Sequence, residues 1–380
     1  MSRIGVLHVI DSLAVGGAEQ IAVSLVNLLP RARYRPHLCT TRREGPLAVA
    51  IRDDVGRLAL ARSRRLDPAA LTRFVGYCRE HDIQVLHAHS TSLFLATIAS
   101  FFRPHPLVVW HDHFGRSLRD RRAWIYRPAV RRAAAAIVVT HDLLRWSRER
   151  LGMPAARIAY IPNFSRPSTP QGPPPALPGE RGGRIVCVAH WREQKDHVTL
   201  LRAFAIVSRR VPAAHLLLLG TAHDDAYGGR VRRELMALGL EQRVSVLGCR
   251  EDVAAVLLGC DIGVLSSASE GLPLALLEYG WAGLPAVATR VGECQEVLDG
   301  GRAGRLVSPS SPEELAVALL RLLASADERC TLGAALAERV RQVYSPEGAV
   351  AAVCRLYEAL VVGTSGDSWE ERASVSATSP

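Results

Sequence analysis

Short apolar runs alternate with longer amphipathic segments along most of this 380-residue chain. The runs are rich in Val, Ile and Leu, which is typical of buried parallel strands. Segments such as 67–81, 196–210, 228–239 and 312–324 instead place apolar residues on one face of a helix. This alternation predicts stacked βα units, and therefore an α/β protein with parallel sheets. The predicted strands are 4–10, 36–40, 84–88, 107–110, 135–140, 157–161, 184–189, 215–219, 243–247, 261–265, 285–288 and 304–307.

A proline-rich stretch interrupts the pattern near the middle of the chain. Residues 162–178 hold seven prolines, which remove backbone donors and oppose regular helix. We therefore expect a linker at 166–182 between two Rossmann-like domains, at 1–165 and 183–345. Ligands in such folds bind beyond the carboxyl ends of the strands, so we expect the two domains to face each other across a cleft.

The end of the chain adds two further parts. An apolar segment at 346–361 follows Ser345 and Pro346 and is predicted to be a helix. Residues 362–380 are rich in Ser, Thr, Gly and acidic residues, which predicts a disordered tail.

Composition narrows the class of protein. Hydrophobic residues make up 48% of the chain and charged residues 22%, as in ordinary globular proteins. The eight cysteines include no Cys-x-x-Cys pair, so reduced thiols are expected rather than a zinc site. Neither a signal-peptide pattern nor a run of about 20 apolar residues is present, which favours a cytoplasmic protein.

The net charge of +10 is unevenly distributed. Residues 1–165 hold 25 Lys and Arg against 12 Asp and Glu, whereas the remainder is slightly acidic. Such a basic excess indicates an anionic partner, which could be a phospholipid head group, a phosphorylated lipid or nucleic acid. An Arg-rich, solvated surface without a partner explains the same count.

Two glycines, Gly16 and Gly17, follow the first predicted strand and precede a helix. Glycine lets a ligand approach the backbone, and the free amides at a helix start favour an anion. A tight packing turn would also use these residues. The Gly-x-Gly-x-x-Gly pattern of dinucleotide-binding proteins is absent at this turn.

A second loop with candidate binding residues follows the strand at 184–189. It reads His190-Trp191-Arg192-Glu193-Gln194-Lys195 and leads into a helix. Arg192 and Lys195 could neutralise a diphosphate there, although two solvated surface cations would read the same way.

The segment from Ser266 to Glu278 carries the most specific signal. A strand ends, a loop of small residues follows, and a helix is expected to start near Pro273. The amides of Gly271 and Leu272 would lie at that helix start, where they can bind phosphate. Glu270 could accept hydrogen bonds from sugar hydroxyls. Glu278 lies in an otherwise apolar helix, where a carboxylate needs a partner such as a ribose diol.

Four histidines follow two strands of the first half: His87 and His89, and His111 and His113. Metal binding is conceivable for such a group. The sequence has no histidine–carboxylate spacing typical of a zinc enzyme, and we expect hydrogen-bonding histidines and no metal.

Together these motifs resemble the retaining family-4 glycosyltransferases with the GT-B fold. The resemblance rests on the Glu270–Glu278 segment, the Arg192/Lys195 loop, the Gly16-Gly17 loop and the stretch 283–292, and it covers about 1–361. It implies a nucleotide-diphospho-sugar in the C-terminal domain, an acceptor in the N-terminal domain, and no cofactor or metal. The returning helix 346–361 would pack on the N-terminal domain.

The resemblance also implies roles for particular residues. Lys195 and Arg192 would hold the diphosphate, Glu278 the ribose, and Glu270 the transferred sugar. Catalytic roles fall to Glu270, His111 and Lys195, His111 resembling the family's N-terminal active-site histidine. Many members have Arg where this chain has His190, which leaves open whether His190 or Arg192 contacts the diphosphate. The expected donor-binding residues are Gly16, Gly17, His190, Arg192, Lys195, Arg250, Glu270, Gly271, Leu272, Pro273 and Glu278.

The expected activity is metal-independent, retaining transfer of a sugar of the hexosyltransferase type from a UDP- or GDP-sugar. The acceptor would be a glycan or polyprenyl-linked glycan in bacterial cell-surface polysaccharide biosynthesis. Seven arginines among aromatic residues in 116–132 indicate peripheral contact with an anionic membrane at its inner face, or else a solvated helix.

Two other functions fit parts of the sequence. A nucleotide-sugar epimerase of the same architecture would lack the Glu270–Glu278 helix in this form. A non-catalytic protein that binds a nucleotide sugar or an anionic polymer is compatible with the basic N-terminal half. Nucleic acid as the polymer would leave Glu270 and Glu278 without a role, so it is not expected to be a partner.

Overall fold

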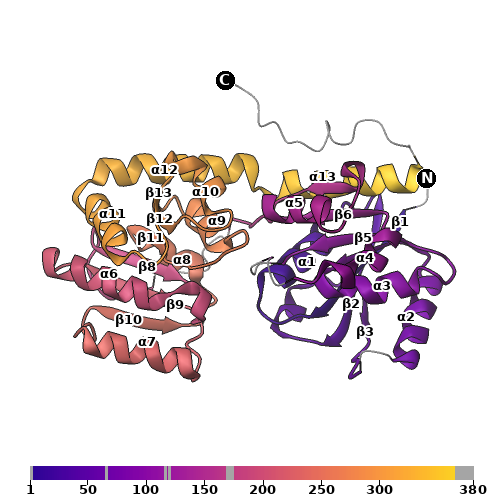
Figure 1. The fold of residues 1–380 in the computed structure, drawn as a ribbon, viewed down its shortest axis with the longest axis horizontal. Helices are drawn as coiled ribbons and strands as arrows, with labels where there is room; N and C mark the ends of the chain where they lie inside the picture. Colours follow the sequence, from indigo (N-terminus) through magenta and orange to yellow (C-terminus); the bar gives the residue numbers. More distant parts are fainter. Residues whose placement is uncertain (1–2, 65–66, 115–117, 119–120, 168–174, 364–380) are drawn as a thin grey trace. The chain divides into compact units, whose positions relative to one another are not determined.

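The computed structural model describes residues 3–64, 67–114, 118, 121–167 and 175–363. The predicted tail at 364–380 lies outside these residues. The chain divides into two compact units, Met1–Asn163 with Pro346–Pro380, and Phe164–Ser345. The strands pair in parallel within each described sheet, which confirms the predicted α/β class (Figure 1).

Unit 1 is built on a sheet with strand order β3-β2-β1-β4-β5-β6-β7. The strands are β1 (Ile4–Ser12), β2 (Tyr34–Arg43), β3 (Gly56–Ala59), β4 (Ile83–His89), β5 (Leu107–Asp112), β6 (Ala135–Val138) and β7 (Ile158–Tyr160). The helices are α1 (Gly17–Leu28), α2 (Pro68–Glu80), α3 (Leu93–Ala99), α4 (Ala123–Arg132), α5 (His141–Glu149) and α13 (Pro346–Val362). Short 3₁₀ turns include η1 (Pro46–Ala50), η2 (Ser90–Ser92) and η4 (Ala155–Arg157).

Unit 2 repeats the arrangement with strand order β10-β9-β8-β11-β12-β13. The strands are β8 (Arg184–Val188), β9 (His215–Leu219), β10 (Val244–Gly248), β11 (Ile262–Leu265), β12 (Ala286–Thr289) and β13 (Arg305–Val307). The helices are α6 (His197–Arg210), α7 (Ala226–Ala237), α8 (Val253–Leu258), α9 (Leu274–Trp281), α10 (Cys294–Val297), α11 (Pro312–Ala324) and α12 (Ala326–Val343). The 3₁₀ turns are η5 (Glu193–Lys195) and η6 (Asp299–Gly301).

Each of the twelve predicted strands appears within two residues of its expected start. The sequence prediction missed β3, which forms the edge of its sheet and reads Gly-Arg-Leu-Ala. An edge strand with half its surface exposed needs no apolar run, so the pattern gave no signal. Pro273 was expected in the first helical turn, but it is the N-cap of α9 and its backbone is extended.

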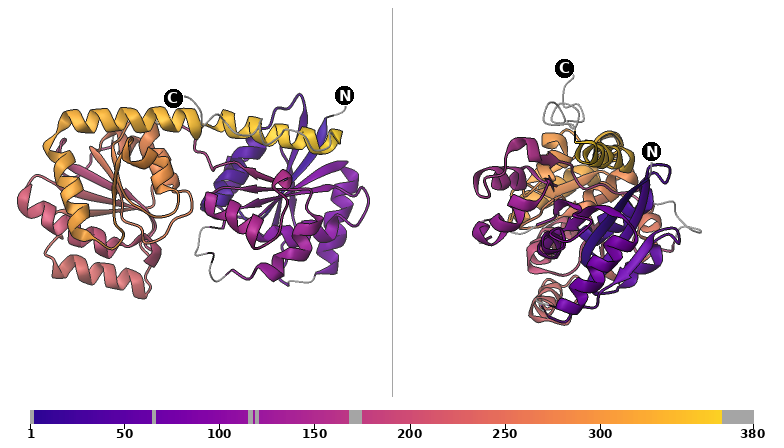
Figure 2. Two further views of the ribbon diagram at one scale, coloured as in Figure 1. Left: turned by 45° about the horizontal axis from the view of Figure 1, so that its top comes forward. Right: turned by 90° about the vertical axis from the view of Figure 1, so that its right-hand side faces the viewer.

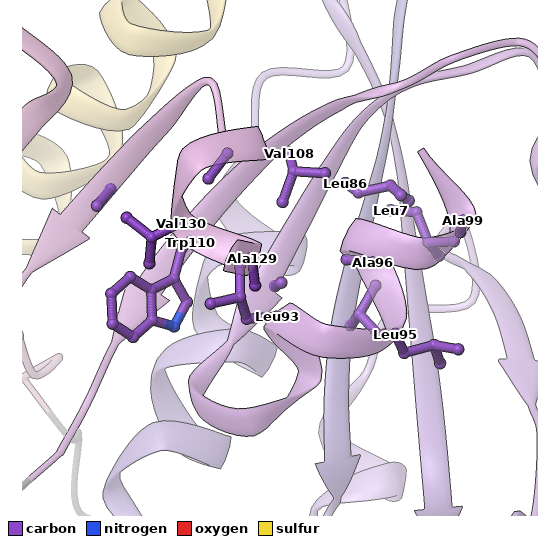
Figure 3. Close-up of a cluster of buried hydrophobic side chains, with 14 of the residues drawn as sticks. Leu7, Leu86, Leu93, Leu95, Ala96, Ala99, Val108, Trp110, Ala129 and Val130 are labelled. Atoms are coloured by element: carbon purple, nitrogen blue, oxygen red, sulfur yellow. The ribbon is translucent and has the colours of Figure 1, made fainter. Parts of the chain in front are cut away.

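Apolar side chains from β1, β4 and β5 pack under α3 and α4 in unit 1. Leu7, Leu86 and Val108 come from adjacent strands and are almost fully buried, as is Trp110. They meet α3 and α4 residues such as Leu93 and Val130 in one cluster (Figure 3). Since side chains alternate along a strand, the next residues point to the opposite face of the sheet.

The helix α13 returns to unit 1 from the end of unit 2 in sequence (yellow in Figures 1 and 2). The Tyr34 hydroxyl donates to the Cys354 carbonyl at 3.2 Å, and Arg33 pairs with Glu358 at 2.7 Å. The Tyr357 side chain is fully buried. These contacts join α13 to unit 1, although it follows that unit's strands by about 180 residues.

Candidate functional site

Strand order reverses in each sheet at a point flanked by candidate loops. In unit 2 the chain runs outward from β8 in one direction and from β11 in the other. In unit 1 the same reversal lies between β1 and β4. Ligands of open α/β sheets bind outside the carboxyl ends of the strands at such a switch point. The loops after β8 and β11, and those after β1 and β4, are therefore the candidate binding loops.

An ion pair joins the two loops in unit 2. Lys195 Nζ lies 2.5 Å from Glu270 Oε1, and the Lys195 and Glu270 side chains are 19% and 6% exposed. Ser267 donates its hydroxyl to the same carboxylate oxygen at 2.6 Å. Because Oε1 takes both contacts, Glu270 is held in one orientation with Oε2 left for another donor.

Backbone contacts fix the spacing of these loops. The amide of Ala268 donates to the Gln194 carbonyl at 2.8 Å. The Ser266 hydroxyl donates to the carbonyls of Lys195 and Asp196, at 3.0 and 3.1 Å. Asp196 has a left-handed backbone, with φ of 44°, and its carboxylate caps α6 through Thr199. The ion pair thus lies on a rigid frame.

A third loop, the turn after β12, packs against the backbone of Glu270 and Gly271. Gly292 has φ of +50°, a conformation that favours glycine. A Cβ there would lie 2.2 Å from the Glu270 carbonyl oxygen and 2.7 Å from that of Gly271. The amide of Glu293 donates to the Gly271 carbonyl at 2.9 Å. The turn after β12 therefore fixes the position of the Glu270–Gly271 backbone.

The start of α9 carries no side-chain cap. Its first amides therefore remain available to an anion that approaches the helix start. Glu278, within α9, has no hydrogen-bond or ion-pair partner in the described part of the chain, and burial raises the pKa of its carboxyl to about 7. The residue as a whole is only partly buried.

The two candidates for diphosphate contact differ in their surroundings. The Thr221 amide donates to His190 Nδ1 at 3.0 Å, so neutral His190 carries its proton on Nε2. Burial, followed by the charges of Arg192, His223 and Lys195, lowers the pKa of His190. Arg192 is exposed and has no ion-pair partner among the described residues. His190 thus offers a fixed neutral donor, whereas Arg192 offers a free guanidinium.

Arg250 also lies outside the Lys195–Glu270 frame. Its guanidinium binds the Asp252 carboxylate with two hydrogen bonds, of 2.7 and 2.5 Å. Its side chain is 30% exposed, and this local pair holds it at the end of β10. A ligand that used Arg250 would have to share it with Asp252.

In unit 1, the Gly16-Gly17 loop follows β1 and opens α1. Gly16 is the N-cap, and as a glycine it has no side chain with which to cap the helix. A Cβ on Gly16 would lie 2.4 Å from the Glu19 carboxylate, which is the flexible end of a side chain. Anion binding by the amides of this loop remains a prediction.

The histidines of β4 and β5 lie together with one that the sequence prediction missed. Parallel register places His8 of β1 beside His87 and His111 beside His89. The four are almost fully buried, and burial, the largest cause, lowers the pKa of each. His113 joins the group, and its pKa is lowered in the same way. All five are therefore neutral near pH 7.

Nitrogens of two triads, His8/His87/His89 and His89/His111/His113, lie within 4.8 Å of one another. Metal ions need ligand lone pairs that converge on one point. The rings of His8 and His87 are nearly parallel, with centroids 4.4 Å apart, and those of His111 and His113 lie 4.0 Å apart. Face-to-face rings direct their lone pairs side by side, which fits a metal poorly. The expectation of no metal remains a prediction.

One arginine of the segment 116–132 does not face the surface. Arg121 is buried and binds Asp112 through two hydrogen bonds, of 2.5 and 3.1 Å. Its guanidinium lies over the rings of Trp146 and Tyr126, with centroids 4.3 and 4.4 Å away. The inclusion of Arg121 in a membrane-contacting surface is therefore wrong. Its charge is matched by Asp112, which follows His111 at the end of β5.

Comparison with known proteins gives the family. Residues 15–167 match the model of Glycosyltransferase Family 4, and residues 182–325 match that of Glycosyl transferases group 1. The chain belongs to the group 1, family 4 glycosyltransferases. This confirms the resemblance read from the Glu270–Glu278 segment and its companion loops.

Several known proteins are similar to this glycosyltransferase. The putative glycosyltransferase EpsF of Bacillus subtilis is 26% identical over 74% of this chain and 78% of its own. The exopolysaccharide phosphotransferase of Streptomyces coelicolor is 30% identical over 64% of this chain, which spans only 25% of that protein. The crystal structure of Anabaena HepE in complex with UDP has a TM-score of 0.79 at 19% identity, covering 94% of this chain and 100% of HepE. That likeness confirms the GT-B fold.

The structure brings some of the predicted site residues of this glycosyltransferase together in unit 2, while others belong to unit 1. In unit 2, Lys195, Glu270 and the start of α9 form one group, with His190 and Arg192 on the preceding loop. Gly16, Gly17 and His111 belong to unit 1. The sequence analysis included Ser267 in the segment from Ser266 to Glu278 but predicted no role for its side chain. It missed Tyr357 and His8 because only strand register and the return of α13 bring them to His87.

Proposed function

We propose that this protein is an enzyme that transfers a sugar from a nucleotide-diphospho-sugar to a glycan or polyprenyl-linked acceptor, with retention and without a metal. Cell-surface polysaccharide biosynthesis is the proposed setting. The observation that carries the proposal is the Lys195–Glu270 pair beside the uncapped start of α9, with the unpartnered carboxyl of Glu278 on the same helix.

Each part of that arrangement suits one part of the donor. The amides before and at the start of α9, beginning with Gly271 and Leu272, would bind the diphosphate together with Lys195 and Arg192. Glu278 would accept hydrogen bonds from the ribose diol, which supply the partner that its buried carboxyl lacks. Oε2 of Glu270 would accept a hydrogen bond from a hydroxyl of the sugar, while Oε1 stays with Lys195 and Ser267.

The chemistry follows from where charge develops. As the bond from the anomeric carbon to the diphosphate breaks, negative charge grows on the leaving oxygen. Prepositioned cations and helix amides stabilise that charge without reorganising, which is the largest contribution in many enzymes. Lys195 is already held in place by its ion pair with Glu270. Such stabilisation performs the task that a bound Mg²⁺ performs elsewhere.

The donor is proposed to be a UDP- or GDP-sugar. HepE, whose fold is similar, was crystallised with UDP and with UDP-glucose. Retention is proposed on the family resemblance. His111 in unit 1 is the proposed polar contact to the reacting sugar, because its Nε2 is buried and has no partner among the described residues.

The protein is proposed to work in the cytoplasm, with peripheral contact to the inner face of the membrane. None of the helices that the structure describes is both long and apolar enough to cross a bilayer. On α4, Trp124 is 65% and Ile125 42% exposed, with Arg127 and Arg131 also exposed on the same helix and Arg122 exposed at its N-cap. Basic and aromatic residues of this kind suit an anionic lipid surface.

The proposal is tested by incubating the purified protein with a panel of UDP-, GDP- and ADP-sugars. Mass spectrometry would detect the released nucleotide and any glycosylated acceptor. We expect hydrolysis or transfer with one nucleotide series, and thermal stabilisation by the same nucleotide. Stabilisation without turnover across acceptors would favour the non-catalytic alternative. Salt-sensitive binding to an anionic polymer, with no response to any nucleotide sugar, would reject the proposed function.

A further inference from the structure

A continuous chain of hydrogen-bonding contacts runs through the buried histidines and one side chain of α13. His113 Nε2 lies 3.0 Å from His89 Nδ1, and His89 Nε2 lies 3.1 Å from His8 Nδ1. His8 Nε2 lies 3.3 Å from the Tyr357 hydroxyl, which also contacts His87 Nδ1. The chain ends where His87 Nε2 lies 2.9 Å from His111 Nδ1.

Each inner ring of this chain, His89, His8 and His87, uses one nitrogen on each side, whereas His113 and His111 at the ends use one. A neutral imidazole has one N–H and one bare nitrogen, and a hydroxyl has one proton to donate. Each contact needs one proton, and two protons or none leave it repulsive. If one group donates its proton to the neighbour nearer His111, that neighbour must in turn donate to the next one. The direction of donation is therefore the same along the whole chain. Only two fully satisfied arrangements therefore exist, and they differ in the direction of every proton.

The two arrangements give His111 opposite chemistry. In one, His111 Nδ1 accepts from His87 and Nε2 carries the proton. In the other, His111 donates to His87 and Nε2 is bare. Nε2 is the atom without a partner in the described part of the chain, so it is the atom that would meet a substrate. The arrangement thus decides whether His111 donates to a substrate oxygen or accepts from one.

The position of Tyr357 selects between them. A phenol O–H is more acidic than an imidazole N–H and forms shorter hydrogen bonds as a donor. The hydroxyl lies closer to His87 Nδ1 than to His8 Nε2, as expected when it donates to His87 and accepts from His8. Burial raises the pKa of Tyr357 well above its ordinary value, which keeps this proton in place.

We propose that Tyr357 is a positioning residue that fixes His111 as the Nε2–H tautomer, a hydrogen-bond donor to the substrate. It acts through His87 and touches no substrate itself. The inference deepens the proposed function and rests on it for the role of His111. It makes the returning helix part of the active site, since removal of α13 would leave His87 and His8 without their shared partner.

The test uses Tyr357→Phe in the full-length protein, with Tyr34→Phe as the matched control. Tyr34 is also buried, and its hydroxyl binds α13 through the Cys354 carbonyl. Its ring meets that of Tyr357 edge-on, but its hydroxyl bonds to none of the described histidines. Selective ¹⁵N labelling of histidine and long-range ¹H–¹⁵N correlation spectra report which nitrogen carries each proton. His111→Gln assigns the His111 signals.

We expect wild-type His111 to be protonated at Nε2, and Tyr357→Phe to populate the Nδ1–H form as well. The kcat for the donor identified by screening should fall about three- to tenfold in Tyr357→Phe, with KM within about twofold. Tyr34→Phe should keep the wild-type tautomer and kcat. A bare Nε2 in the wild type, or a loss of kcat in Tyr357→Phe with an unchanged tautomer, would overturn the inference.

Metal analysis of the same samples gives a further check. One bound zinc per chain at the histidines would replace the shared protons and overturn the inference. If the tautomer responds to Tyr357→Phe but no donor sugar is ever turned over, the proposed function fails while the control of His111 by Tyr357 stands. The spectra therefore separate the two failures.

Discussion

At the scale of single residues, Lys195 and Glu270 are each positioned to do more than pair with the other. Lys195→Ala removes the cation proposed at the leaving diphosphate, and Glu270→Ala removes the carboxylate proposed at the sugar. We expect each to lower turnover at least about tenfold, or ~1.4 kcal/mol in the barrier. Arg202→Ala, which breaks an exposed pair with Glu234, is the control and should retain wild-type turnover. Full activity in both site variants would contradict the assignment.

Lys195→Ala carries a second expectation. It leaves a carboxylate that is 6% exposed without its cation. Removing one partner of a largely buried pair costs about 3 kcal/mol or more, whereas loss of both partners is milder. Urea unfolding should therefore show Lys195→Ala to be less stable than Lys195→Ala/Glu270→Ala. The reverse order would mean that Glu270 is well hydrated in the free protein.

Glu278 gives a pH-dependent prediction. In the folded protein its carboxyl ionises near pH 7, against 4.5 in the unfolded chain. The folded state thus holds a proton more tightly, and its stability falls as pH rises from 4.5 to 7. Glu278→Gln should stabilise the free protein at pH 8 by at most about 3 kcal/mol, and the gain should vanish towards pH 4.5.

The same substitution should weaken nucleotide-sugar binding, because the amide cannot accept both ribose hydrogen bonds. Thermal unfolding at pH 5 and pH 8, with and without the donor, measures both effects. The exposed Glu241→Gln in unit 2 is the control and should change neither. A Glu278→Gln variant that is less stable at pH 8 would show that the carboxylate is well paired in the free protein.

At the scale of elements, the turn after β12 supports the site from outside it. Gly292→Ala combines a left-handed backbone with a Cβ 2.2 Å from the Glu270 carbonyl oxygen. Gly300→Ala has a similar φ, +63°, but nothing lies within 4 Å of its Cβ. The backbone strain is shared and costs about 1 kcal/mol in each variant.

We therefore expect Gly300→Ala to lose about 1 kcal/mol of stability and no activity. Gly292→Ala should lose more stability and at least about tenfold in turnover, because Glu270 and Gly271 must shift. Urea unfolding and the donor assay measure both variants. Equal effects in the two would show that the Glu270 loop tolerates displacement.

How far the sequence predicts this structure depends on the kind of signal. Buried strands and amphipathic helices repeat with a period, so α6 and α11 were predicted within one residue of their ends. The sequence placed Lys195 and Glu270 on two separate loops that follow strands, but it did not predict that they form an ion pair. The burial of Arg121 was not, since an arginine inside an aromatic cluster and one on a surface look alike in sequence. His8 and Tyr357 needed a register and a returning helix that no local pattern encodes.

At the scale of the whole molecule, the excess positive charge of residues 1–165 would attract an anionic surface. The exposed arginines and aromatic residues of α4 would provide the contact, since Lys and Arg near an anionic bilayer contribute about 1 kcal/mol each. We expect the protein to float with vesicles that contain anionic lipid, and not with neutral vesicles. Because this attraction is screened, binding should weaken as salt is raised from about 0.05 to 0.5 M.

Purely electrostatic attraction to the bilayer would be sensitive to salt but not to the loss of apolar side chains. Substitution of the exposed apolar residues of α4 therefore distinguishes this attraction from insertion into the interface. Trp124→Ala/Ile125→Ala keeps every arginine but removes two exposed apolar groups that would enter the interface. Vesicle affinity should fall at least about tenfold, because each group would contribute about 1 kcal/mol or more. Met236→Ala, at a residue 57% exposed on α7, is the control and should bind as the wild type does. If the α4 variant binds unchanged, the attraction to the bilayer is purely electrostatic and the two apolar groups of α4 do not enter the interface.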